Sequence, residues 1–335
     1  MTICWSLSTP SGKSSPKFLR VNGTCWRRKG HTMDIGMVGL GRMGGNMAER
    51  LAKGGHRVVG YDRDPDSRRH TADRTFETVD SLEHLTERLQ KPRVVWVMVP
   101  SGNPTEGTMS ALMQVLEPGD VVVDGGNSNY KDSMRRGADF HRRGIVMLDA
   151  GVSGGVWGLT DGYCLMIGGD DDAFALVEPA LKALAPSPSE GYAHVGALGA
   201  GHFVKMVHNG IEYGLMQAYA EGFELMRAKD LFALDMAQIA EVWRHGSVIR
   251  SWLLDLTADA LNQDPTLGDI DPWVEDSGEG RWTVEESVEL AVPLPVISIA
   301  LQARFRSRQS EAFGFRMLAA MRNRFGGHAV RHTNG

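Results

Sequence analysis

Three polar residues, two of which are suited to proton transfer, recur at helical spacing in the middle of the chain. Lys205, Asn209 and Glu212 are four and three positions apart, so in a helix they share one face with His202. An uncharged lysine can act as a general base, and a nearby carboxyl group can supply a proton. Lysine and glutamate alone are more typical of a surface ion-pair row, but asparagine, glycine and two histidines lower the helix propensity of such a row. The spacing therefore favours a catalytic face.

A glycine-rich turn near residue 40 is typical of a dinucleotide site. Gly39, Gly41 and Gly44 follow a predicted strand and open a predicted helix, where glycines permit a tight turn, a close pyrophosphate and close helix packing. Unpaired N–H groups at the helix start can bind the phosphates. The residues expected to bind the cofactor are Gly39, Leu40, Gly41, Arg42, Met43, Gly44, Asp62, Arg63, Val99, Pro100 and Asn127.

Asp62 bears on which dinucleotide is used. It ends the second predicted strand, 23 residues after Gly39, where a carboxylate accepts both hydroxyls of an adenosine ribose. A 2′-phosphate there would meet a like charge, at a cost of roughly 1 to 4 kcal/mol. The adjacent Arg63 is suited either to stacking on adenine or to pairing with a 2′-phosphate. The sequence favours NAD over NADP and leaves NADP as the alternative.

The order of the predicted elements indicates an α/β Rossmann-type nucleotide-binding domain over residues 33–197. Short apolar runs alternate with helical stretches, which is typical of a parallel sheet covered on both faces. The predicted strands are Ile35–Leu40, Arg57–Tyr61, Val94–Val99, Val121–Asp124, Ile145–Asp149 and Tyr163–Ile167. The predicted helices between them are Met43–Lys53, Ser81–Gln90, Pro104–Leu116 and Tyr130–Arg143.

Helical periodicity dominates after about residue 196. We expect a long helix from Gly199 to about Ala228, a polar loop over Leu261–Gly280, a helix that ends at Arg308 and a last one over Glu311–Arg324. The fold class is therefore a Rossmann-type α/β domain followed by an all-α helical domain. Residues 198–335 are expected to bind substrate and to form the dimer contacts.

Composition and charge exclude several classes of protein. The chain is 42% hydrophobic, and no apolar run reaches the roughly 18 residues of a membrane span. Its three cysteines have no metal-ligand spacing and cannot form a disulfide framework, which favours a cytoplasmic location. The net charge of −5 combines +6 from residues 1–32 with −11 from the remainder. Residues 1–32 are expected to be a disordered or non-native extension, with a transit peptide as the alternative.

Six motifs resemble the decarboxylating 6-phosphogluconate dehydrogenase family in its short form. They are Gly39–Gly44, Asp124–Ser128, Gly151–Gly155, Lys205–Tyr213, Gly280–Thr283 and Arg322–His328. The resemblance implies oxidative decarboxylation of 6-phospho-D-gluconate to D-ribulose 5-phosphate and CO₂ in the pentose phosphate pathway, with reduction of NAD(P). It implies that Lys205 takes the C3 hydroxyl proton during hydride transfer and that Glu212 protonates C1 of the enediol. Asn209 would help to hold the sugar acid.

The resemblance also implies a site for the carboxylate, hydroxyls and phosphate of the substrate. The residues carried over are Asn127, Ser153, Gly154, Gly155, His208, Asn209, Tyr213, Arg281, Arg304, Arg322 and His328. In the family, the last two reach in from a neighbouring subunit, so a homodimer or homotetramer is expected. The long form has a lysine before its Gly-Lys-Trp-Thr stretch. Residues 275–283 contain none here, and Arg281 is the candidate to supply that charge.

The sequence leaves two alternative functions. A β-hydroxy acid dehydrogenase acting on 3-hydroxyisobutyrate also uses a helix lysine, but a small unphosphorylated acid needs neither Glu212 nor the seven arginines of residues 304–335. A nucleotide-sensing protein without catalysis would be expected to lack the Lys205 face. Nucleic-acid binding is not expected, because no aromatic stacking platform accompanies the basic tail.

Overall fold

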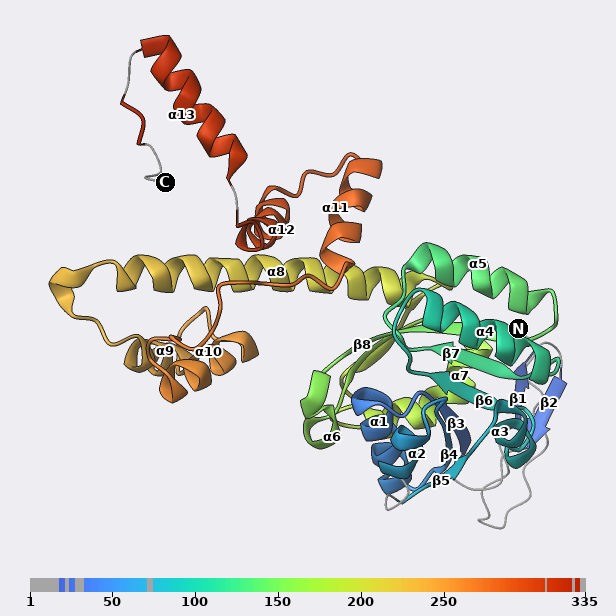
Figure 1. Cartoon of the computed structure of the whole chain (residues 1–335). Coiled ribbons are helices and arrows are strands. Elements are labelled where there is room, and N and C mark those ends of the chain that lie inside the picture. Colours follow the sequence, from blue (N-terminus) through green and yellow to red (C-terminus); the bar gives the residue numbers. More distant parts are fainter. Residues whose placement is uncertain are drawn as a thin grey trace. The chain divides into compact units, whose positions relative to one another are not determined.

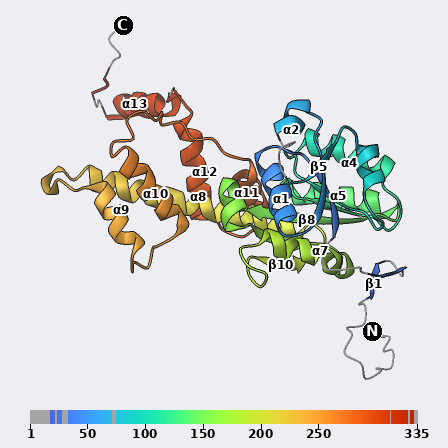
Figure 2. The same ribbon diagram turned by 90° about the horizontal axis from the view of Figure 1, so that it is seen from below.

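The computed structural model describes residues 18–21, 24–27, 33–70, 75–310, 312–326 and 329–331. The chain divides into an N-terminal unit, Met1–Met206, and a C-terminal unit, Val207–Gly335. Helix α8 (Ala200–Arg227) contributes its first turns to the former and the rest to the latter (Figure 1; a second view is shown in Figure 2). A short antiparallel pair, β1 (Phe18–Val21) and β2 (Thr24–Arg27), precedes the main sheet along the chain.

An eight-stranded sheet forms the centre of the N-terminal unit. Its order is β10-β9-β8-β7-β6-β3-β4-β5, and every neighbouring pair from β5 to β8 is parallel. The strands are β3 (Asp34–Val38), β4 (Arg57–Tyr61), β5 (Glu77–Val79), β6 (Val94–Val97), β7 (Val121–Asp124), β8 (Val146–Ser153), β9 (Cys164–Gly168) and β10 (Tyr192–Gly196). Counted along the chain from β3, this is the 3-2-1-4-5-6 order of the Rossmann fold, so the predicted fold class is confirmed.

The last predicted strand joins the sheet in the opposite sense to that expected. β8 and β9 are antiparallel, with Asp149 opposite Gly168 and Ser153 opposite Cys164. Only residues 154–163 connect them, and a parallel crossover needs a dozen residues or more. Sequence patterning also missed β10, whose Tyr-Ala-His-Val-Gly sequence lacks a continuous apolar run because it is an edge strand.

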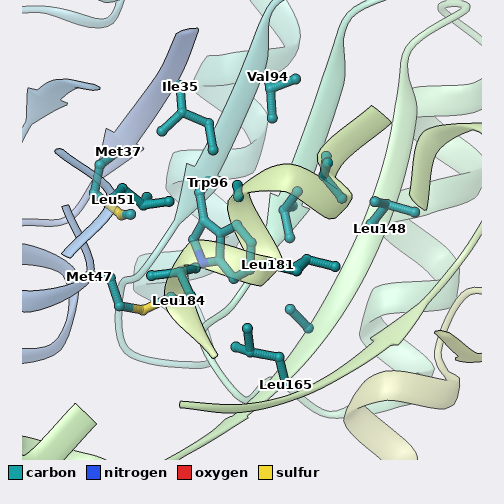
Figure 3. Packing of buried hydrophobic residues seen from close by; sticks show 14 of the residues in the cluster. Ile35, Met37, Met47, Leu51, Val94, Trp96, Leu148, Leu165, Leu181 and Leu184 are labelled. Atoms are coloured by element: carbon teal, nitrogen blue, oxygen red, sulfur yellow. The ribbon is translucent and has the colours of Figure 1, made fainter. Parts of the chain in front are cut away.

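Helices cover both faces of the sheet, and alternate residues of each strand pack into the hydrophobic core on one face or the other. The helices of this unit are α1 (Arg42–Lys53), α2 (Pro65–His70), α3 (Leu82–Arg88), α4 (Asn103–Val115), α5 (Tyr130–His141), α6 (Gly158–Asp161) and α7 (Asp171–Leu184). Trp96 on β6 is fully buried among Met47, Leu51, Leu181 and Leu184, which come from α1 and α7 (Figure 3). On the other face, side chains of α3, α4 and α5 pack against the remaining strand residues.

The described part of the C-terminal unit is helical. It comprises most of α8, then α9 (Met236–Arg244), α10 (Trp252–Gln263), α11 (Glu279–Glu289), α12 (Pro295–Ser307) and α13 (Phe313–Gly326). The expected polar loop spans residues 264–278, between α10 and α11. Helices α9 and α10 were not predicted, and both begin at side-chain caps, Asp235 and Ser251. No helix of the described residues is both long and apolar enough to cross a membrane.

Candidate active site

The turn between β3 and α1 contains three glycines, of which two are tightly packed and one borders open space. Gly39 has a φ of +94°, and a Cβ atom there would lie 2.3 Å from the carbonyl oxygen of Met98. A Cβ at Gly44 would lie 1.9 Å from the carbonyl oxygen of Gly39. A Cβ at Gly41 would have no heavy atom within 4 Å. The first and third glycines are therefore required by the fold, and the second leaves room beside the start of α1.

The start of α1 carries no negative charge of its own. Gly41 provides no side-chain cap, and no acidic residue occupies the first turn. The first N–H groups of a helix have no acceptor within the helix, so this helix start suits an anionic phosphate group. The turn follows β3, which neighbours β6 where the strand order reverses. Dinucleotides bind at this position in doubly wound sheets. Val99 and Pro100 follow β6 at the same edge and are half-buried and exposed, respectively.

Asp62 lies directly beside this turn. Its Oδ2 accepts a hydrogen bond of 2.7 Å from the backbone N–H of Leu40, and its Oδ1 accepts one of 2.9 Å from the N–H of Asp64. These bonds hold the carboxylate at the end of β4, where the ribose is expected. Arg63 and Arg42 are exposed, and Met43 is half-buried.

Asn127 connects the loop after β7 to the end of β8. The residue has a φ of +51°, and its amide donates to the carbonyl oxygen of Val152 and accepts from the Val152 N–H, at 3.1 and 2.9 Å. Its side chain therefore fixes the backbone next to Ser153. Gly154 and Gly155 follow with φ values of +129° and +52°, which turn the chain sharply after Ser153.

The first turns of α8 are held against the sheet by a buried carboxylate. Asp149 on β8 accepts hydrogen bonds of 2.7 Å from the N–H groups of both Gly199 and His202. His202 is itself buried, and its Nδ1 lies 2.7 Å from the hydroxyl of Ser133. This capping role of Asp149 could not be expected from its position 50 residues before Gly199.

The hydrogen bonds from the start of α8 to Asp149 also place Lys205 against the sheet. It is 5% exposed, and a Cβ at Gly151 would lie only 2.5 Å from the Lys205 Cβ, so helix and strand approach closely. Burial raises the pKa of the Cys164 thiol, and the nearby positive charge of Lys205 partly opposes this by lowering that pKa. Because Cys164 pairs with Ser153 across the strands, Lys205 lies at the end of β8 near the predicted substrate loop. A lysine that acts as a general base must hold its amine uncharged when it takes the proton.

Further along α8, a second cluster lies in the C-terminal unit. The Nδ1 of His208 is 3.0 Å from Oδ1 of Asn209 and 3.9 Å from Oε2 of Glu212. Asn209 donates through Nδ2 to Glu279, which is buried at the start of α11. The side chains of His208 and Glu212 are about two-fifths exposed, at 40% and 38%. Glu279 was not among the predicted site residues.

Tyr213 and Arg304 form a third cluster within the same unit. The guanidinium of Arg304 lies 3.6 Å above the ring of buried Tyr213 and donates to the carbonyl oxygen of Glu275. The Tyr213 hydroxyl accepts from the Ser277 N–H at 2.9 Å. These contacts bring together two residues that the sequence placed in the phosphate site.

Arg281 shares a carboxylate with a residue that sequence reasoning missed. Arg281 Nε and Arg308 Nη2 donate to Asp276 at 2.8 and 2.7 Å. The bond from Arg281, with that from Arg308, lowers the pKa of Asp276 to about 2 against the opposing effect of burial. Because the folded pKa lies below the ordinary value of 3.8, this contact stabilises the fold above about pH 4 and loses that effect as the pH falls towards 2.

The C-terminal tail is only partly described. Arg322 is exposed on α13 and has no hydrogen bond or ion pair with another described residue. His328 lies outside the described residues. The predicted use of both by a neighbouring subunit stays a prediction.

Comparison with known proteins agrees with this geometry. Residues 34–196 match the family model "NAD binding domain of 6-phosphogluconate dehydrogenase", and residues 201–313 and 232–334 match "6-phosphogluconate dehydrogenase, C-terminal domain". A Haloferax volcanii protein named 6-phosphogluconate dehydrogenase, NAD(+)-dependent, decarboxylating, is 42% identical over 299 residues, which cover 89% of this chain and 98% of that protein.

Solved structures show the same relationship. A Plasmodium falciparum 6-phosphogluconate dehydrogenase superposes with a TM-score of 0.76 at 28% identity, covering 90% of this chain and 67% of that one. A Mycobacterium tuberculosis 3-hydroxyisobutyrate dehydrogenase gives 0.66 at 24% identity over 80% of this chain and 91% of its own, which shows a shared fold alone.

Fold and site together define a dehydrogenase with an NAD-binding domain and a helical domain. The chain belongs to the 6-phosphogluconate dehydrogenase family. The resemblance seen in the sequence motifs is thereby confirmed.

Proposed function

We propose that the chain converts 6-phospho-D-gluconate and NAD(P)⁺ to D-ribulose 5-phosphate, CO₂ and NAD(P)H. The observation that carries this proposal is buried Lys205 on the helix that also bears Asn209 and Glu212. In this proposal residues 33–197 bind the dinucleotide and residues 198–335 bind most of the substrate. The open space at Gly41 and the uncapped start of α1 fit the cofactor's pyrophosphate.

The nicotinamide cofactor, when bound, supplies the hydride acceptor. The uncharged amine of Lys205 takes the proton of the C3 hydroxyl while hydride leaves C3. The resulting 3-keto acid loses CO₂, and the electrons of the broken bond form an enediol whose oxygen receives the proton held by Lys205. The carboxyl group of Glu212 then protonates C1 of the enediol, which gives the ketose product.

The ends of the substrate are assigned to the other clusters. Ser153, the Gly154–Gly155 backbone and Asn209 suit the carboxylate and hydroxyls. Arg304, stacked on Tyr213, suits the phosphate, because a guanidinium binds phosphate oxygens in pairs. Arg281 and Arg308 add two cations against the single charge of Asp276. A small β-hydroxy acid without phosphate would have no use for this positive charge.

NAD is the proposed cofactor in preference to NADP, and Asp62→Asn tests this. Asparagine can still accept from the Leu40 N–H, so the variant removes the charge and keeps the turn. We expect the ratio of kcat/KM for NADP to that for NAD to rise about fivefold or more, because a like charge at the 2′-phosphate costs roughly 1 to 4 kcal/mol. Steady-state kinetics with both cofactors measures it. Equal efficiency of the unmodified protein with NAD and NADP would contradict the role of Asp62.

A matched pair of glycine variants tests the pyrophosphate site. Gly41→Ala places its methyl group in open space, so we expect the melting temperature to stay unchanged and the Kd for NADH to rise about tenfold or more. Gly44→Ala instead forces a methyl group against the Gly39 carbonyl and is expected to destabilise the fold. Thermal unfolding and fluorescence titration with NADH separate the two effects. Unchanged NADH affinity in Gly41→Ala would exclude this position for the pyrophosphate.

We further propose a homo-oligomer in which the tail serves a neighbouring site. The described part of the C-terminal unit has only small buried clusters, and many large apolar side chains on its helices are exposed. They include Ile211, Leu215, Trp252, Val296, Ile299, Phe315 and Leu318. Exposed apolar surface of this extent is typical of an interface between subunits.

Mixing two defective variants tests the exchange of tails. Lys205→Ala lacks the base, and a chain carrying both Arg322→Ala and His328→Ala lacks the tail groups. After joint unfolding and refolding, hybrids would contain a site with a native base and a neighbour's native tail. Activity well above the sum of the separate preparations is expected, and no recovery would show that each tail serves its own chain.

A further inference from the structure

We propose that Glu279 is a positioning residue that fixes the orientation of the Asn209 amide, and this inference rests on the proposed function. Glu279 is the first residue of α11 and is 6% exposed. Its Oε2 accepts from Nδ2 of Asn209 and, at 3.3 Å, from the hydroxyl of Ser277. The mechanism described above assigns this buried carboxylate no step.

Glu279 stands at the start of a helix, a position that acidic residues commonly occupy. It follows Gly278, which caps α11 without a side chain, and it is the acidic residue of the first helical turn. A helix start favours a carboxylate over a neutral side chain. An ionised carboxylate has only acceptor atoms. It can therefore meet the nitrogen end of an amide and not the oxygen end.

The contact with Glu279 fixes which way the side-chain amide of Asn209 is oriented. With Nδ2 directed to Glu279, Oδ1 lies 3.0 Å from Nδ1 of His208. The two ends of an asparagine amide have nearly the same shape, so packing alone does not choose between them. A flipped amide would place two acceptor oxygens against each other at Glu279. Glu279 thus determines which end of Asn209 is presented to each neighbour.

Close packing between α8 and α11 holds Asn209 and Glu279 next to each other. A Cβ at Gly210 would lie 2.8 Å from Cγ2 of Thr283, and one at Gly280 would lie 2.5 Å from the Tyr213 ring. Thr283 also donates its hydroxyl to the carbonyl oxygen of Glu279 at 2.8 Å. Helices α8 and α11 therefore approach closely at two points next to the Asn209–Glu279 contact.

A double-mutant cycle tests the proposal. Glu279→Gln has the same shape but can donate as well as accept, so it no longer dictates the orientation of the amide. We expect kcat/KM for 6-phosphogluconate to fall about tenfold, as for loss of a hydrogen bond to a charged group. In an Asn209→Ala background the same change should have no further effect. Glu279→Asp should recover part of the loss, and exposed Glu289→Gln on the same helix should leave kinetics unchanged.

A spectroscopic readout keeps this test separate from that of the proposed function. The side-chain NH₂ signals of Asn209 can be assigned in ¹⁵N spectra by their disappearance in Asn209→Ala. In Glu279→Gln these signals should move and their hydrogen exchange should quicken. Absence of turnover with 6-phosphogluconate in the unmodified protein would defeat the proposed function, while the amide signals would still decide the role of Glu279. Unchanged signals, or additive kinetic losses in the cycle, would overturn the inference.

Discussion

Replacement of Lys205 by alanine is expected to lower kcat for NADH formation from 6-phosphogluconate by about 10³- to 10⁴-fold. Lys205 is proposed to remove one proton before decarboxylation and to return one during it, and positioned acid–base groups typically contribute 10²- to 10⁴-fold each. Lys205 is 5% exposed and packs directly against Gly151, so the alanine variant removes the amine from a buried position. Single-turnover absorbance of NADH measures the effect on the hydride step directly.

Lys205→Arg is the control for charge. Arginine keeps a positive charge but cannot lose its proton at ordinary pH, so it should be as inactive as alanine if Lys205 is a base. Both variants should retain NADH binding. Turnover within tenfold of the unmodified protein in either one would remove Lys205 from the proposed role.

Replacement of Glu212 by alanine is expected to slow a later step. Hydride transfer precedes protonation of the enediol, so the first turnover of NADH should persist while steady-state kcat falls about 10²- to 10³-fold. A burst of NADH followed by slow turnover is the expected trace in a stopped-flow experiment. Solvent deuterium should also enter C1 of ribulose 5-phosphate more slowly.

The control for this second variant is Glu221→Gln on the same helix. Glu221 is exposed and accepts a hydrogen bond from Gln217, so its replacement should leave both phases unchanged. Loss of the first turnover in Glu212→Ala would place the carboxyl group in the hydride step instead. An unchanged steady-state rate would exclude it from the proton transfers.

Local patterns were enough to predict the elements that carry the chemistry. The glycine turn and the Lys205–Glu212 spacing each lie within a short stretch of chain, where turn geometry and the helical period decide the arrangement. The order of apolar runs likewise predicted the parallel strands β3, β4, β6, β7 and β8, but not the three-residue strand β5. The antiparallel β9 depended on the length of a connection, and edge strand β10 lacks the apolar run that marks a buried strand.

Partners distant in sequence account for what the sequence did not reveal. Asp149 caps α8 from β8, and Glu279 meets Asn209 from 70 residues away. Arg281 was predicted to supply a positive charge to the substrate site, and in the structure it shares Asp276 with Arg308. The contacts of Asp149 with Gly199, Asn209 with Glu279 and Asp276 with Arg308 have no local signature, because each joins residues at least 32 positions apart.

The most direct test of the proposed function is simultaneous measurement of NADH and CO₂ from the purified protein supplied with 6-phosphogluconate and NAD. The account predicts both products in equal amounts, with gluconate and 3-hydroxyisobutyrate giving far lower kcat/KM because neither offers a phosphate to Arg304 and Tyr213. NADH formation without CO₂, or equal rates with gluconate, would contradict it.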